Sequence, residues 1–128
     1  MPGDREALEG AFAQFARGDF RSATRFYAPE VEWIEHRGVP GAGEFAGMDG
    51  VRQGFRGWLG SWKDYRLELL ELVEGDERFC AAVRGSGRGA MSDAYAEDLF
   101  FQVWTFSDGR VVLIENFAER EEALAALG

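Results

Sequence analysis

The first apolar positions of the chain recur with the period of a helix. They lie between Asp4, which is placed to cap a helix, and Gly18, which is placed to end one. Asp19 then begins a shorter helix, which Pro29 prevents from continuing. The residues expected to face inward are Ala7, Leu8, Ala11, Phe12 and Phe15 in the first helix, and Phe20, Ala23 and Phe26 in the second. The two segments predict a helical hairpin.

A strand, a loop and a third helix are predicted next. Residues 31–36 (VEWIEH) are bulky and β-branched, as in a strand, whereas residues 37–47 (RGVPGAGEFAG) are glycine-rich, as in a loop. Asp49 is placed to cap a helix with a one-sided apolar stripe. Glycines 54, 57 and 60 each weaken this helix by about 1 kcal/mol relative to alanine, so we expect another element to pack close to its backbone. The stripe consists of Val51, Phe55, Trp58, Leu59 and Trp62.

The second half of the chain is predicted to be extended. Strands are expected over residues 65–74, 78–88, 95–106 and 110–118, and Ser107-Asp108-Gly109 is the strongest hairpin signal. A short helix over residues 119–127 closes the chain. The element order ααβαββββ with a C-terminal helix predicts a segregated α+β fold, and 128 residues are typical of one domain, here 1–128.

Composition narrows the classes of partner. A hydrophobic fraction of 46% suits a packed core, and four tryptophans and eleven phenylalanines can line a cavity as well as fill a core. The net charge of −9 argues against nucleic acid and anionic membrane surfaces. No apolar run approaches the roughly 18 residues of a membrane span, and the N-terminus lacks the pattern of a signal peptide. We therefore expect a cytoplasmic protein.

Cysteine and histidine are too scarce for a metal site. The single cysteine, Cys80, lies in the apolar run FCAAV, so a buried strand thiol is expected rather than a nucleophile. His36 is the only histidine, and a surface position near the loop is expected for it. The sequence therefore predicts no metal and no cofactor.

Three segments together resemble the SnoaL-like family of the nuclear transport factor 2-like superfamily. They are FARGDFRSATRFYAPEVEW, GVPGAGEFAGMDGVRQGFRGWLGSW, and the late pair VWTFSDGRVV and ENFAEREEALAAL, in the family's order. The resemblance implies a cone-shaped α+β barrel, in which a strongly curved antiparallel sheet wraps around three helices and leaves a cavity. It also implies a homodimer through the convex sheet face. Independently of this resemblance, the late strands carry apolar residues at both odd and even positions, so both faces of the sheet should be covered.

Glu35 is the candidate catalytic base. Ketosteroid isomerases, which are similar in fold, carry their carboxylate base at the matching place near the end of the first strand. Strand parity leaves open whether Glu35 faces the cavity or solvent, and Trp33 shares its face. The isomerase's partner groups fall on Ala11 and near Phe101 or Gln102, so that activity is not expected.

The sequence departs from the site patterns of two other activities in the superfamily. The Asp-Arg-Asp set of limonene-epoxide hydrolases matches Ser86, Arg84 and Asn116, of which only the arginine is retained. Polyketide cyclisation needs an acid or base near the late strands, where Glu97 and Asp98 occupy opposite faces; either one points inward, or both mark an exposed strand start.

The sequence thus predicts a pocket for a small apolar organic molecule, with either cofactor-free acid–base chemistry or binding alone. A third reading is a structural dimer whose tryptophans fill its core. Buried amides on apolar strands need partners, so Gln102 and Asn116 are candidate ligand contacts or structural hydrogen bonds. The expected ligand-binding residues are Trp33, Phe55, Trp58, Trp62, Arg84, Ser86, Glu97, Gln102, Trp104 and Asn116.

Overall fold

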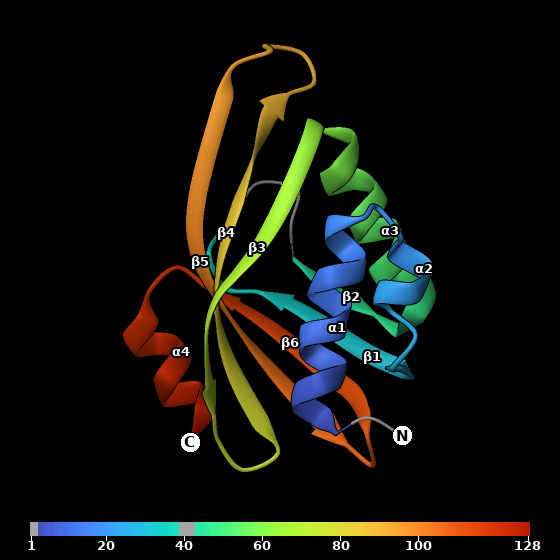
Figure 1. Ribbon diagram of the computed structural model, residues 1–128, viewed down its shortest axis with the longest axis vertical. Coiled ribbons are helices and arrows are strands. Elements are labelled where there is room, and N and C mark those ends of the chain that lie inside the picture. Colours follow the sequence, from blue (N-terminus) through green and yellow to red (C-terminus); the bar gives the residue numbers. More distant parts are fainter. Residues whose placement is uncertain (1–2, 39–42) are drawn as a thin grey trace.

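The protein is an α+β structure in which one curved, open sheet separates three helices from a fourth. The computed structural model describes residues 3–38 and 43–128. Figure 1 shows α1, α2 and α3 on one side of the sheet and α4 on the other. The helices are α1 (Asp4–Ala16), α2 (Phe20–Ala23), α3 (Gly47–Gly60) and α4 (Arg120–Leu127). The strands are β1 (Tyr27–Glu35), β2 (Glu44–Ala46), β3 (Trp62–Glu74), β4 (Arg78–Gly89), β5 (Tyr95–Ser107) and β6 (Arg110–Phe117).

The six strands lie in the order β2-β1-β6-β5-β4-β3. The α+β fold and the curved sheet predicted from the sequence are confirmed. Neighbouring strands are antiparallel except β1 and β6, which run parallel, and the sheet does not close. A parallel pair needs a long crossover, and here more than half of the chain, residues 36–109, lies between its two strands. This pair brings Glu35 beside Asn116.

Each face of the sheet has its own apolar cluster. On the concave face, Leu8, Phe12 and Val51 of the helices pack with Trp104 and Ile114 of the strands. On the convex face, Phe101, Val103 and Phe117 pack with Ala123 of α4. Both faces of β5 are therefore covered over part of its length, as predicted, and α4 supplies cover that the sequence pattern left to a partner chain.

The structure confirms the predicted glycine at the end of α1, the aspartate at the start of α2 and the hairpin between β5 and β6. Gly18 has φ +76° directly after the C-cap of α1, and Asp19 caps α2 by accepting a hydrogen bond from the Ser22 backbone N–H at 3.1 Å. Asp108 and Gly109 both have positive φ between the paired residues Ser107 and Arg110. That conformation belongs to the tight two-residue hairpin predicted there.

The predicted caps Asp4 and Asp49 are wrong. The caps are Gly3 and Ala46, and both aspartates lie in the first turn, where a carboxylate still interacts favourably with the helix dipole. α2 ends at Ala23, so Pro29 does not stop it but lies within β1, which begins four residues earlier than predicted.

Three further predictions need correction. Trp62 belongs to β3 rather than to the third helix, and Phe20 is 38% exposed rather than inward, although its ring lies 4.8 Å from that of Phe15. The predicted loop over 37–47 contains β2 at its end, because Phe45 pairs with Trp33; its residues 39–42 lie outside the described residues. Phe45 also explains one glycine of α3, since a Cβ at Gly54 would lie 3.0 Å from the Phe45 ring.

No helix among the described residues is both long and apolar enough to cross a membrane.

Candidate functional site

A cavity of about 520 Å³ lies between α3 and the concave face of the sheet. Strand parity decides which side chains reach it: Trp33 and Glu35 of β1, Asn116 of β6, and Phe100 and Gln102 of β5 all face this side. Its remaining aromatic wall comes from Phe15, Phe45, Phe55, Trp58 and Tyr65. Trp33 and Trp58 therefore line an open space and do not fill it.

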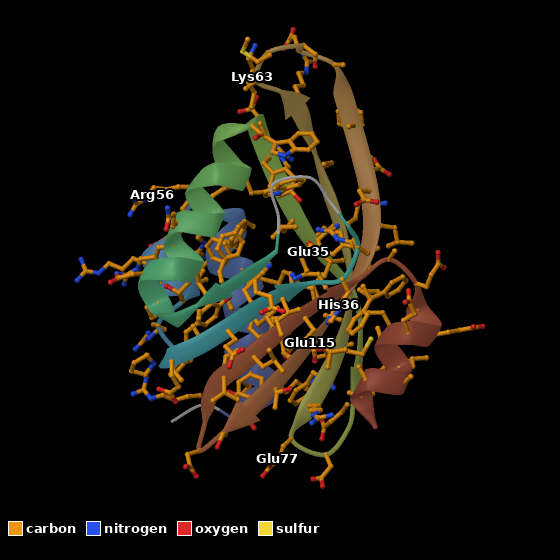
Figure 2. All side chains as sticks on the ribbon, turned by 180° about the vertical axis from the view of Figure 1, so that it is seen from behind. Glu35, His36, Arg56, Lys63, Glu77 and Glu115 are labelled. Carbon is orange, nitrogen blue, oxygen red and sulfur yellow. The ribbon has the colours of Figure 1, made fainter. Side chains whose placement is uncertain are left out.

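Three polar side chains of the wall, Glu35, Asn116 and Gln102, lie in one row across the sheet. Glu35 pairs with Asn116 in the β1–β6 register, and Asn116 pairs with Gln102 in the β6–β5 register. Figure 2 shows Glu35 between α3 and the sheet, whereas Arg56 points away from the sheet on the outer side of α3. The floor of the cavity is thus a polar row set within an apolar and aromatic wall.

Glu35 is bound on both oxygens by Arg37. Arg37 donates from Nε to Oε1 and from Nη2 to Oε2, each at 2.7 Å, and its backbone N–H donates to Oε1 at 2.9 Å. The two side chains are only 4% and 12% exposed. This bidentate pair is the strongest polar interaction in the cavity wall.

Arg37 is held from two further sides. Its Nη1 donates to Oδ2 of Asp98 at 3.1 Å, and its guanidinium lies 4.2 Å from the centroid of the Phe100 ring. Burial by itself lowers the pKa of Arg37, but the hydrogen bonds and charge of Glu35 raise that pKa above its ordinary value. Arg37 therefore stays cationic at the edge of the cavity.

The side chain of Tyr65 on β3 extends over Gly85 of the neighbouring strand β4. Its hydroxyl occupies the place where a Cβ of Gly85 would be, and its ring packs against Trp58 and Trp62. Burial raises the pKa of Tyr65, so the phenol stays protonated at neutral pH. Gly85 and Gly87 on the concave face of β4 leave the room that this side chain needs.

Some predicted site residues lie elsewhere. Arg84, Ser86 and Glu97 point to the convex face, because the odd residues of β4 and the even residues of β5 face the helices. Arg84 instead binds Glu68 there at 2.8 Å. Trp62 packs beside the wall against Trp58.

Trp104, His36 and Asp98 have distinct surroundings. Trp104 lines a small adjoining void of about 20 Å³ and does not line the cavity itself. His36 stacks on Phe117, and its Nε2 lies 3.0 Å from a Glu115 oxygen at the partly exposed outer surface. The Asp98 side chain is 67% exposed and reaches the site only through Arg37.

Arg37 and Tyr65 were missed by the sequence reasoning. Arg37 lies two residues after Glu35, just beyond the end of β1, in a segment that the sequence predicts to be a loop. Alternate glycines in Gly85-Ser86-Gly87 were the signal for a large side chain crossing β4. Among residues 3–38 and 43–128, no group of three or more His, Cys, Asp or Glu side chains is placed to hold a metal ion.

Solved structures of the same fold come from several sources. An NTF2-like protein from Burkholderia thailandensis is 24% identical with a TM-score of 0.84, covering 100% of this chain and 99% of its own. TerC, co-crystallised with polyporic acid, is 21% identical with a TM-score of 0.80, covering 97% and 96%. A putative SnoaL-like polyketide cyclase from Jannaschia sp. CCS1 is 13% identical with a TM-score of 0.78, covering 97% and 90%.

No curated protein matches the chain by sequence. The family model of the SnoaL-like domain, by contrast, matches residues 8–114. This stretch runs from the first buried leucine of α1 into β6 and so includes most of the cavity wall. The chain belongs to the SnoaL-like domain family.

Proposed function

We propose that the cavity binds a small, largely apolar organic molecule that carries a neutral polar group. The observation that carries this proposal is an open space of about 520 Å³ with a largely aromatic wall and a few polar groups, three of them in one row across the sheet. Ligand sites commonly combine such a wall with a few placed polar groups, and their volumes range from about 300 to 1,000 Å³.

The charges of the site favour a neutral ligand. Glu35 and Arg37 are the only charged side chains among the described residues of the wall, and they neutralise each other. The net charge of −9 on the chain disfavours anions in general. The putative SnoaL-like polyketide cyclase and TerC, which was co-crystallised with polyporic acid, share this fold, and this supports an organic molecule as the ligand class.

Acid–base catalysis with Glu35 as the base is the second candidate. The burial of this carboxylate in an apolar cavity favours it. However, both oxygens of Glu35 accept hydrogen bonds from Arg37, so a substrate proton would compete with a guanidinium. Binding without turnover is therefore the first proposal.

The test is a titration with N-phenyl-1-naphthylamine, a neutral probe whose fluorescence rises in apolar surroundings. Gly57 and Gly60 both belong to α3, and a Cβ at either would meet no described atom within 4 Å, but only Gly57 lines the cavity. Gly57→Trp should weaken binding by at least about tenfold, or about 1.4 kcal/mol, whereas the matched control Gly60→Trp should bind like the wild type. A wild type without saturable binding, or a Gly57→Trp variant that binds normally, contradicts the proposal.

We also propose that two copies associate through the convex face of the sheet. Figure 1 shows that α4 covers only part of this face. Beyond it, Tyr95 and Leu99 on β5 are 63% and 54% exposed. In sedimentation velocity, Leu99→Lys should convert a dimer to a monomer, while Met91→Lys at the exposed turn between β4 and β5 should not. A monomeric wild type contradicts this assembly.

A further inference from the structure

A chain of three buried side chains ends at the cavity. The indole Nε1 of Trp104 donates to Oε1 of Gln102 at 2.9 Å, and Nε2 of Gln102 donates to Oδ1 of Asn116 at 3.0 Å. Their exposed fractions are 4%, 2% and 0%. Buried polar groups are nearly always paired, and the first two links follow that rule.

The indole fixes the orientation of both amides. An indole N–H can only donate, so Gln102 must turn its oxygen toward Trp104 and its nitrogen toward Asn116. Asn116 must then accept with its oxygen, which leaves its Nδ2 as a donor at the end of the chain. The amide of Asn116 is thereby prevented from presenting an acceptor in that direction.

This donor has no acceptor among the residues that the structure describes. Nδ2 of Asn116 is buried and makes no hydrogen bond to any residue in 3–38 or 43–128. The carboxylate of Glu35, its neighbour in the β1–β6 register, binds Arg37 and makes no hydrogen bond to Nδ2. Asn116 itself forms part of the cavity wall. The wall therefore holds a fixed, desolvated donor that no described residue pairs with, and such a group favours a ligand that can accept from it.

We propose that Asn116 selects the ligand by donating from Nδ2 to a neutral oxygen acceptor, such as a ketone or quinone carbonyl. This inference rests on the proposed binding function. Gln102 and Trp104 are positioning residues, which hold the amide in its donating orientation. A hydrocarbon of the same shape leaves Nδ2 unpaired and binds more weakly.

The test compares 9-fluorenone with fluorene, which share a rigid tricyclic shape and differ in the carbonyl. Both are measured by displacement of N-phenyl-1-naphthylamine. The wild type should prefer 9-fluorenone by roughly fivefold to tenfold, the worth of one neutral hydrogen bond. Asn116→Leu should bind both equally, with the affinity for fluorene unchanged. Trp104→Phe should reduce the preference, because the two amides can then turn over.

An infrared measurement needs no variant. The carbonyl stretching band of 9-fluorenone bound to the wild type should lie at lower frequency than in an apolar solvent, so the proposal stays testable even if Asn116→Leu does not fold. Equal wild-type affinities for the two probes, or an unshifted band, overturn the role of Asn116 but leave the pocket intact. A full preference in Trp104→Phe overturns the positioning role. Failure of all three probes to bind overturns the proposed binding function itself.

Discussion

Glu35 and Arg37 lie two residues apart at the end of β1 and bind each other through two side-chain hydrogen bonds of 2.7 Å. Their side chains are almost inaccessible to solvent, so each is the main counterion of the other. The pair places one positive and one negative charge in the cavity wall and leaves that wall neutral.

Removing one member of this pair should destabilise the protein strongly. Glu35→Leu or Arg37→Met should each lower the free energy of unfolding by about 3 kcal/mol or more, because the remaining charge stays buried and unpaired. The double variant should lose much less than the sum, as urea denaturation of all four proteins would show. Additive losses would contradict a coupled pair. Asp98→Asn, at a carboxylate that is 67% exposed, is the control and should change stability by less than about 0.5 kcal/mol.

Adding one methyl group at Gly85 should disturb the cavity. The new Cβ would collide with the Tyr65 hydroxyl, so Gly85→Ala should lower stability by about 1–3 kcal/mol. In a Tyr65→Ala background the same change should be nearly neutral, because the obstructing side chain is gone. Thermal denaturation of the four proteins measures this coupling. An equal loss in both backgrounds would show that Tyr65 is not the obstacle.

Stability should fall in alkaline solution. Burial raises the pKa values of Tyr27 and Tyr65 above the ordinary value of 10.0. Above about pH 10 the unfolded chain releases protons that the folded chain retains, so unfolding becomes more favourable as the pH rises toward the folded pKa values. Urea denaturation between pH 8 and 11 checks the slope, and Tyr65→Phe should make it shallower. A slope unchanged in that variant would count against a raised pKa at Tyr65.

Cys80 should be unreactive in the native protein. The residue is only 2% exposed, and burial raises the pKa of its thiol, so the thiolate is both scarce and inaccessible. A thiol reagent such as 5,5′-dithiobis(2-nitrobenzoic acid) should label it slowly in buffer and at once in denaturant. Cys80 belongs to the convex-face apolar cluster that packs against Ala123 of α4, so rapid labelling without denaturant would show that this cluster opens readily.

The sequence predicted the elements better than the site. Periodicity located the helices and strands, and the resemblance supplied their arrangement. Neither could show which face of a strand lies toward the cavity, because a shift of one residue in strand register exchanges the two faces. The sequence predicted that Trp33 and Glu35 lie on the same face of their strand, and both line the cavity. Arg84 and Ser86 match positions of the limonene-epoxide hydrolase set, but neither lines the cavity, because both point to the convex side.

The pattern of hydrophobic and polar residues could not predict interactions that depend on packing. Nothing in the local sequence indicates that Arg37 turns back onto Glu35 instead of entering solvent with its loop. Likewise, the unpaired nitrogen of Asn116 follows from a tryptophan on the neighbouring strand, a relationship that only the strand register reveals.

The parallel pairing of β1 with β6 also dictates when the cavity can form. Glu35 comes from the first strand and Asn116 from the last, so the polar row is assembled from distant parts of the chain. During synthesis, the first five strands leave the ribosome before this row can exist, and contacts of such high sequence separation form slowly. Ligand recognition should therefore appear at the end of folding, and a nascent chain that ends before β6 should have no binding site.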